Sequence, residues 1–166
     1  MNKYYYFVSQ LPFLQLGKIS PVSTDDFLAE AGKWLSDKEF SFLKNARLDK
    51  FENFKKQEPA ALKEFNEFEY RLREQIYLYR KARKQEKEYR LSGALGQIFS
   101  EGNPLDIEKG ILRLRWEFLD EKETFHHFDL NFIVIYFLKM QLVLRLSSFD
   151  KEKGAEIFGE LSKINM

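Results

Sequence analysis

An apolar stretch near the end of the chain limits the fold more than any other feature. Leu130 to Leu146 is hydrophobic on nearly all sides when drawn as a helix, and Asp129 stands before it as an N-cap. A helix that is apolar all round must be buried among other helices. Lys139, Gln141 and Arg145 interrupt the stretch, so its uninterrupted part is far shorter than the roughly 20 residues that span a bilayer. The sequence therefore predicts a central core helix and no membrane insertion.

The segments on either side of this stretch carry helix start signals. Asn103 is an N-cap followed by Pro104 at the first helical position, and the helix they open has two apolar faces, which predicts burial against more than one neighbour. Asp150 is expected to cap a separate last helix. Four apolar residues of that helix are expected to turn inward: Ile157, Phe158, Leu161 and Ile164. Residues 103–166 are thus predicted to form a three-helix unit at the core.

The first third of the chain predicts short helices. Ser23 is an N-cap for a helix to about Leu35, and Ser36 with Glu39 forms a capping box for the next helix. Residues 3–16 are compatible with a short strand or with a helical turn broken by Pro12. No partner strand is evident, so a sheet is not expected.

The middle of the chain predicts one long helix, over about residues 60–90. No Gly or Pro occurs from Ala60 to Arg90. Apolar residues recur there at three- and four-residue spacings: Leu62, Phe65, Phe68, Leu72, Ile76 and Tyr79. A helix of about 30 residues is roughly 45 Å long, and its charged second half is expected to project into solvent.

Composition supports an all-α protein of six or seven helices in a single domain, residues 1–166. The chain has 17 Phe and eight Tyr but only four Pro and eight Gly, which suits aromatic packing between helices. Its 27 basic and 26 acidic residues nearly balance, which argues against a dedicated nucleic-acid binder. The absence of cysteine excludes a disulfide scaffold, a thiolate nucleophile and a Cys-type zinc site.

The two histidines, His126 and His127, are the first candidates for chemistry. Adjacent residues point in different directions on a helix, so the pair cannot chelate a metal from one helical face. Asp120, Glu121 and Glu123 could complete a metal site or supply an acid–base pair. The favoured interpretation is a polar turn between helices with exposed carboxylates. No phosphate loop, dinucleotide glycine pattern or serine elbow is present, so a non-enzymatic protein without cofactor or metal is predicted.

A basic cluster in the long helix is the candidate partner-binding site. The residues predicted to contact the partner are Arg80, Lys81, Arg83, Lys84 and Lys87. Arg90 follows them in the sequence, and Tyr77, Tyr79 and Tyr89 are close by. Glu74, Glu86 and Glu88 interleave with the cations, as on an ordinary solvated helix. A solvated face or an acidic protein partner is favoured, and a nucleic-acid-binding helical module is the alternative.

Blocks at both ends of the chain also resemble a known family. They are Tyr4-Tyr5-Tyr6-Phe7-Val8-Ser9 with Leu11-Pro12, Ser23-Thr24-Asp25-Asp26-Phe27, Asn103-Pro104-Leu105, Arg115-Trp116-Glu117-Phe118-Leu119-Asp120, Phe128-Asp129-Leu130, Tyr136-Phe137-Leu138-Lys139-Met140-Gln141 and Phe149-Asp150-Lys151-Glu152-Lys153-Gly154. This combination resembles a family of small helical proteins encoded among the subunits of bacterial V-type ATPases. The last helices are also distantly similar to the socket protein of these ATPases, called d in eukaryotes. In that protein, repeated three-helix units form a socket between the central stalk and the membrane rotor ring. The chain is about half the size expected of it.

The resemblance implies a non-enzymatic accessory, assembly or stalk-associated component of a V-type, proton- or sodium-translocating ATPase. The implied partners are other ATPase subunits, through contacts with the central stalk or contacts like those of the socket protein, with no small-molecule substrate. The implied location is the cytoplasm, peripheral on the cytoplasmic face of the inner membrane through the ATPase complex. No catalytic residues carry over from either family.

Overall fold

The apolar stretch that dominates the sequence forms the axis of the structure. The computed structural model describes residues 2–49, 58–100 and 102–164, with mainly the backbone over residues 150–164. The helices are α1 (Lys3–Gln10), α2 (Thr24–Trp34), α3 (Asp37–Asn45), α4 (Ala60–Lys84), α5 (Gly93–Ser100), α6 (Pro104–Glu123) and α7 (Leu130–Ile164). Within these described ranges the regular structure is entirely helical, so the predicted all-α bundle is confirmed.

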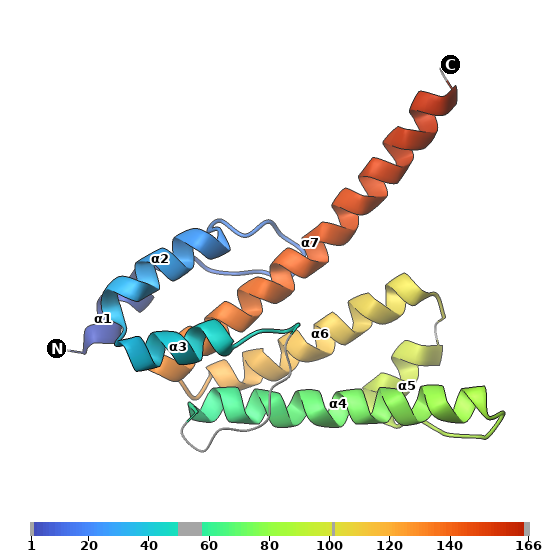
Figure 1. Ribbon diagram of the computed structural model, residues 1–166, viewed down its shortest axis with the longest axis horizontal. Coiled ribbons are helices and arrows are strands. Elements are labelled where there is room, and N and C mark those ends of the chain that lie inside the picture. Colours follow the sequence, from blue (N-terminus) through green and yellow to red (C-terminus); the bar gives the residue numbers. More distant parts are fainter. Residues whose placement is uncertain (1, 50–57, 101, 165–166) are drawn as a thin grey trace.

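Helix α7 is buried by helices on two sides. Residues 133–140 are all buried in succession, as expected for a helix that is apolar all round. Helices α1 to α3 pack along one side of its first half, and α4 and α6 lie along the other (Figure 1). Gln141 links the first group to α7, because its Nε2 donates to the Ala46 carbonyl at 2.7 Å. Helices α1 to α3 and the pair α4 and α6 therefore pack against the same central helix, α7.

The short helices begin where the capping signals place them. Ser23 accepts a hydrogen bond from the backbone N–H of Asp26, and Ser36 and Glu39 form the predicted capping box. Residues 3–10 are helical, which decides between the strand and the helix that the sequence left open. Asn2 caps α1 by accepting from the Tyr4 N–H.

Helix α6 packs its two apolar faces into two different clusters, as predicted. Leu112 and Leu119 belong to the main core around α7, which also contains Phe65 of α4. Ile111 belongs to a smaller cluster with Leu72 of α4 and Leu95 of α5. The N-terminus of α4 is also held from α7, since the Ala61 N–H donates to Asn131 Oδ1 at 3.0 Å. Contacts of this kind satisfy one of the amide groups that a helix start leaves unpaired.

The predicted long helix over residues 60–90 ends earlier than its pattern suggested. Helix α4 stops at Lys84, and residues 85–92 return as a non-helical segment. The stop could not be foreseen because no Gly or Pro marks it. Instead Glu86 adopts a left-handed conformation with φ of 54° and reverses the chain. The end of α4 is also covered by α5, with the rings of Tyr79 and Phe99 5.0 Å apart.

The predicted three-helix unit over residues 103–166 is wrong in its number of helices. Because α7 continues to Ile164, the described residues 103–164 contain two helices, α6 and α7. Asp150 lies within α7 and does not begin a new helix. Ser147 and Ser148 donate their hydroxyls to the carbonyls of Leu144 and Arg145, so the polar side chains are satisfied without a helix break. The C-terminal part of α7 extends away from the other helices (Figure 1). The predicted inward-facing residues Ile157, Phe158, Leu161 and Ile164 lie outside the described side chains.

Among the described residues one segment is long and apolar enough to cross a membrane, Leu130–Phe149, with a mean hydropathy of 1.6. The core helix of a soluble bundle meets the same criterion. About 61% of an 18-residue window within this segment is buried against the rest of the chain, as the central position of α7 requires. The expected absence of membrane insertion stays a prediction.

Candidate functional site

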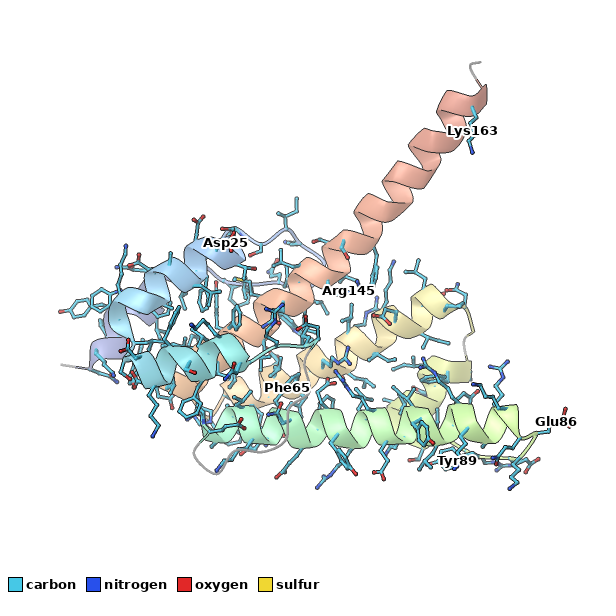
Figure 2. All side chains as sticks on the ribbon, viewed as in Figure 1. Asp25, Phe65, Glu86, Tyr89, Arg145 and Lys163 are labelled. Atoms are coloured by element: carbon cyan, nitrogen blue, oxygen red, sulfur yellow. The ribbon has the colours of Figure 1, made fainter. Side chains whose placement is uncertain are left out.

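The end of α4 forms a sharp reversal that we call the basic turn, residues 80–90. The Lys87 N–H donates to the Ala82 carbonyl at 2.9 Å, and the Glu86 N–H donates to the Arg83 carbonyl at 3.3 Å. These two bonds are the Schellman arrangement, in which a residue in the left-handed conformation closes a helix. Glu86 occupies that position at the far end of α4, and Tyr89 lies on the returning chain (Figure 2).

The predicted partner-binding residues are all on the surface. Exposed side chains in the basic turn include Arg80, Lys81, Arg83, Lys84 and Lys87. The first four lie on α4, whereas Lys87 lies after the helix, which corrects its predicted helical position. The reversal brings Lys87 and Arg83 together, around a hollow of about 490 Å³ that Tyr79, Tyr89 and Arg90 also line.

The other three predicted cations, Arg80, Lys81 and Lys84, do not line this hollow. Arg80 lines a separate hollow with Arg73, Tyr77 and Arg115. The Lys81 ammonium lies 6.0 Å from the centroid of the Tyr77 ring, at the outer limit of a cation–π contact. Neither hollow includes Lys84 among its lining residues. The five cations therefore form an exposed surface, and only Arg83 and Lys87 share one concave site.

The charge of this concave site suits an anionic group. Arg83, Lys87 and Arg90 supply three positive charges, against one negative charge from Glu88. Cations near the C-terminus of a helix also stabilise its macrodipole, typically by about 0.3–1 kcal/mol each. The arrangement offers guanidinium and ammonium donors to carboxylate or phosphate oxygens, with tyrosine rings alongside.

The His-His turn has a structural role in the bundle. His126 Nδ1 lies 2.9 Å from Asp129 Oδ2. The other carboxylate oxygen of Asp129 accepts from the Phe132 N–H at 2.8 Å and so caps α7. His127 is exposed. In the described part of the chain, no three His, Cys, Asp or Glu side chains are grouped closely enough to hold a metal ion.

A buried lysine on α7 is one ionisable group whose role sequence reasoning missed. The Lys139 side chain is 7% exposed, and its Nζ contacts Asp120 at 2.8 Å and also contacts Glu123. The ammonium lies 4.6 Å from the centroid of the Trp116 ring. Of the three carboxylates considered for acid–base work, Asp120 and Glu123 therefore serve as counter-ions, whereas Glu121 is exposed. The available signal was a charged residue in the middle of an apolar helix, which requires a partner.

Next to this lysine, Tyr136 connects α7 to the segment after α1. Its hydroxyl donates to the Pro12 carbonyl at 2.7 Å. Burial, together with the charge of Glu123, raises the pKa of Tyr136 to about 12. The hydroxyl is therefore protonated at neutral pH and acts as a hydrogen-bond donor that fixes the loop.

Comparison with protein families places the second half of the chain. A family model described as "Protein of unknown function (DUF2764)" matches residues 82–165, which is half of the chain. The match begins inside the basic turn and continues through α5, α6 and α7. No curated protein and no solved structure matches the chain.

Proposed function

This chain belongs to the DUF2764 family, and we propose that it acts as a non-enzymatic accessory, assembly or stalk-associated component of a V-type, proton- or sodium-translocating ATPase. The proposal rests on the sequence resemblance for the identity of the complex. The proposed partners are other subunits of that ATPase, through contacts with the central stalk or contacts like those of the socket protein. The proposed location is the cytoplasmic face of the inner membrane, where the ATPase complex holds the protein.

The proposed way in which the protein binds its partner rests on one observation. The basic turn presents Arg83 and Lys87 together at an exposed site, within the segment that the family match covers. Exposed cations of this kind steer an acidic surface toward a defined orientation and raise the rate of encounter. The bound state then draws on guanidinium–carboxylate hydrogen bonds, which are charge-assisted and directional. We therefore assign the ATPase contact to the basic turn, with an acidic surface on the partner.

A pair of matched double variants tests this assignment. Tagged protein is recovered from its native host at moderate salt, and retained ATPase subunits are quantified by mass spectrometry. We expect Arg83→Glu with Lys87→Glu to reduce retention at least about tenfold. Lys18→Glu with Arg113→Glu makes the same change in net charge at exposed positions elsewhere and is expected to retain the subunits. Equal retention by both variants would remove the basic turn from the contact.

The alternative function is binding of nucleic acid by the same turn. The observation in its favour is that Tyr79 and Tyr89 line the hollow with Arg83 and Arg90, because bases stack on aromatic and guanidinium groups. Glu88 in the same hollow opposes a polyanion. A fluorescent single-stranded RNA of about 15 nucleotides, titrated at several salt concentrations, decides between the two functions. Steeply salt-dependent binding that Tyr89→Leu weakens would support the nucleic-acid function, and ATPase subunits that co-purify would oppose it.

A further inference from the structure

The outer face of α4 carries a regular row of side chains that the proposed contact at the basic turn does not use. Helix α4 lies along the outer edge of the bundle, with α6 and α7 on one side of it (Figure 1). Its buried residues Leu62, Phe65 and Leu72 face that side. Six residues on the opposite side are spaced by three and four positions in turn, and we call them the α4 seam: Glu67, Tyr70, Glu74, Tyr77, Lys81 and Lys84. This is the spacing of the a and d positions through which two helices pack side by side.

The α4 seam is exposed along its whole length. Tyr70 and Tyr77 are 52% and 60% exposed, and Leu78 next to the seam is 37% exposed. In the part of the chain that the structure describes, none of the four charged seam residues forms an ion pair. The Lys81 ammonium lies near the Tyr77 ring instead, 6.0 Å from its centroid. The seam therefore combines aromatic surface with charges that the described chain does not neutralise.

The order of the charges along the seam determines which neighbour it fits. Both glutamates lie in the first half of the seam and both lysines lie at its end. If a second α4 lay parallel to the first, each seam residue would face its own copy, and like charges directly opposite repel. In an antiparallel pair, each a position lies opposite a d position of the other helix. The seam then meets itself in reverse order.

Every pairing produced by this reversal is favourable. Glu67 lies opposite Lys84 of the second copy, which gives an ion pair. Tyr70 lies opposite Lys81 of the second copy, which gives a cation–π contact. Glu74 lies opposite Tyr77 of the second copy, whose hydroxyl can donate to the carboxylate. A two-fold axis repeats each of these pairings, so the same surface supplies both sides of the contact.

We propose that two copies of the chain pair through the α4 seam in an antiparallel, two-fold arrangement. The seam spans roughly 25 Å of helix. A partner of one charge sign, such as nucleic acid or an anionic membrane, matches one half of the seam and is repelled by the other half. The contact is sensitive to salt because its charges are exposed. Arg83 and Lys87 are not part of the seam, so pairing leaves the concave site of the basic turn accessible.

Charge reversal at the two ends of the seam tests the pairing. Sedimentation velocity of the full chain at low salt gives the dissociation constant of the dimer. Lys81→Glu with Lys84→Glu makes the seam acidic throughout, and Glu67→Lys with Glu74→Lys makes it basic throughout. We expect each variant alone to associate at least about tenfold more weakly and an equimolar mixture of the two to recover the dimer. Lys18→Glu with Arg113→Glu makes the same charge change as the first variant at exposed positions elsewhere and should leave association unchanged.

Disulfide trapping tests the antiparallel orientation. The chain has no cysteine, so Glu67→Cys and Lys84→Cys each introduce a single thiol. In the proposed dimer the same position of the two copies is roughly 25 Å apart, whereas a disulfide requires Cα atoms within about 7 Å. We therefore expect a disulfide between Glu67→Cys and Lys84→Cys when the two are mixed, with one of them tagged so that the product is identified by mass. Neither variant alone should form a disulfide-linked dimer.

Four results would overturn the proposal. One is a wild-type chain that stays monomeric at millimolar concentration and low salt. The second is association of the charge-reversed variants equal to that of the wild type, with the helical signal in far-ultraviolet circular dichroism unchanged. The third is a mixture of the two variants that stays monomeric. The fourth is efficient linkage of either cysteine variant to itself, which would show a parallel pair. Retention of ATPase subunits through Arg83 and Lys87 is measured separately, so the two proposals can fail independently.

Discussion

Arg115 on α6 and Glu69 on α4 form a two-point ion pair inside the bundle. Nε of Arg115 contacts one carboxylate oxygen, and its Nη2 donates to the other oxygen at 3.1 Å. Arg73 donates to that second oxygen at 3.0 Å. The Glu69 side chain is 3% exposed, so two guanidinium groups neutralise one buried carboxylate. The pair ties α4 to α6 beside the apolar contacts of Phe68 and Leu72.

Removal of Arg115 is expected to destabilise the fold strongly. Arg115→Met leaves Glu69 buried with Arg73 as its remaining cation, and loss of one member of a buried pair costs about 3 kcal/mol. The double variant with Glu69→Met removes both charges and is expected to recover most of that loss. Urea unfolding followed by circular dichroism measures both. Stability of Arg115→Met equal to the wild type would show that the pair does not hold the two helices.

Removal of Lys139 is expected to have a smaller effect, although this lysine is also buried. Its partners Asp120 and Glu123 are 65% and 33% exposed, so they remain hydrated after Lys139→Met. The new methionine packs into an apolar environment, and the expected loss is below about 1 kcal/mol. Urea unfolding followed by circular dichroism measures the free energy of unfolding of this variant as well. A loss as large as that of Arg115→Met would contradict the argument that exposure of the partners determines the effect.

Acid is expected to weaken the contact between α1 and α3. Burial alone raises the pKa of the Glu39 carboxyl, but hydrogen bonds from Lys3, Tyr4 and Ser36 outweigh it and lower the pKa to about 2 from 4.5. Because the folded value is depressed, the stabilisation is present above about pH 5 and is lost as the pH falls toward 2. With solvent screening it amounts to roughly 1–2 kcal/mol.

Glu39→Gln is the matched variant for this pH dependence. Its side chain keeps the shape but has no charge to protonate, so the unfolding free energy should vary less between about pH 5 and about pH 2. At neutral pH the variant should be less stable than the wild type by about 1–2 kcal/mol. If the unfolding free energies of the two proteins changed in parallel across this pH range, the acid sensitivity would belong to groups other than Glu39.

Glu86 is expected to be a site where glycine stabilises the protein. Its φ of 54° lies in the left-handed region, which side-chain-bearing residues adopt at a cost of roughly 1 kcal/mol. Glycine adopts this conformation freely but has more entropy to lose on folding. The net gain expected for Glu86→Gly is about 0.5 kcal/mol, seen as a higher midpoint in thermal unfolding. Glu86→Ala keeps the strain and serves as the control, and a lower midpoint for Glu86→Gly would contradict the expectation.

Local signals in the sequence predicted the fold well where a specific residue determines a helix start. Ser23, Ser36 and Asn103 cap the helices expected of them, because each side chain satisfies an N–H of its own first turn. Helix ends were harder to predict. Glu86 reverses the chain although neither Gly nor Pro marks the position, and Asp150 lies within α7 although it could have begun a helix.

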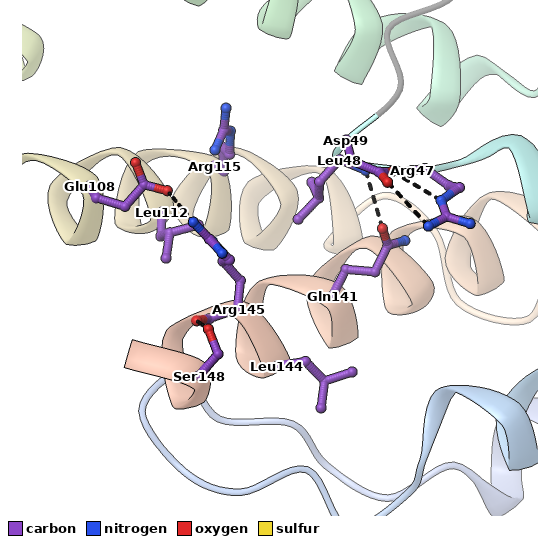
Figure 3. A pocket seen from close by; sticks show the side chains of 10 residues that line it. All are labelled: Arg47, Leu48, Asp49, Glu108, Leu112, Arg115, Gln141, Leu144, Arg145 and Ser148. Atoms are coloured by element: carbon purple, nitrogen blue, oxygen red, sulfur yellow. Dashed lines mark hydrogen bonds and ion pairs between the residues drawn. The ribbon is translucent and has the colours of Figure 1, made fainter. Parts of the chain in front are cut away.

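The candidate site could be predicted in part. The basic residues are exposed as their charge predicts, but the hollow exists only because Lys87 folds back beside Arg83. A second hollow, which Leu48, Leu112 and Leu144 line together (Figure 3), could not be predicted, since these residues come from segments that are far apart in the sequence. Contacts between α4 and α6, such as the buried ion pair, likewise depend on how the two helices meet. Such relationships are properties of tertiary packing and have no local sequence pattern.

The most direct test of the proposed function is binding of the purified protein to membrane vesicles. One set of vesicles carries the assembled V-type ATPase of the native host with its cytoplasmic side outward, and the other comes from a strain without the ATPase genes. Co-sedimentation is measured over a range of protein and salt concentrations. The account predicts saturable binding to the ATPase vesicles alone, weakened by salt and by Arg83→Glu with Lys87→Glu. Equal binding to both sets of vesicles, or to neither, would contradict it.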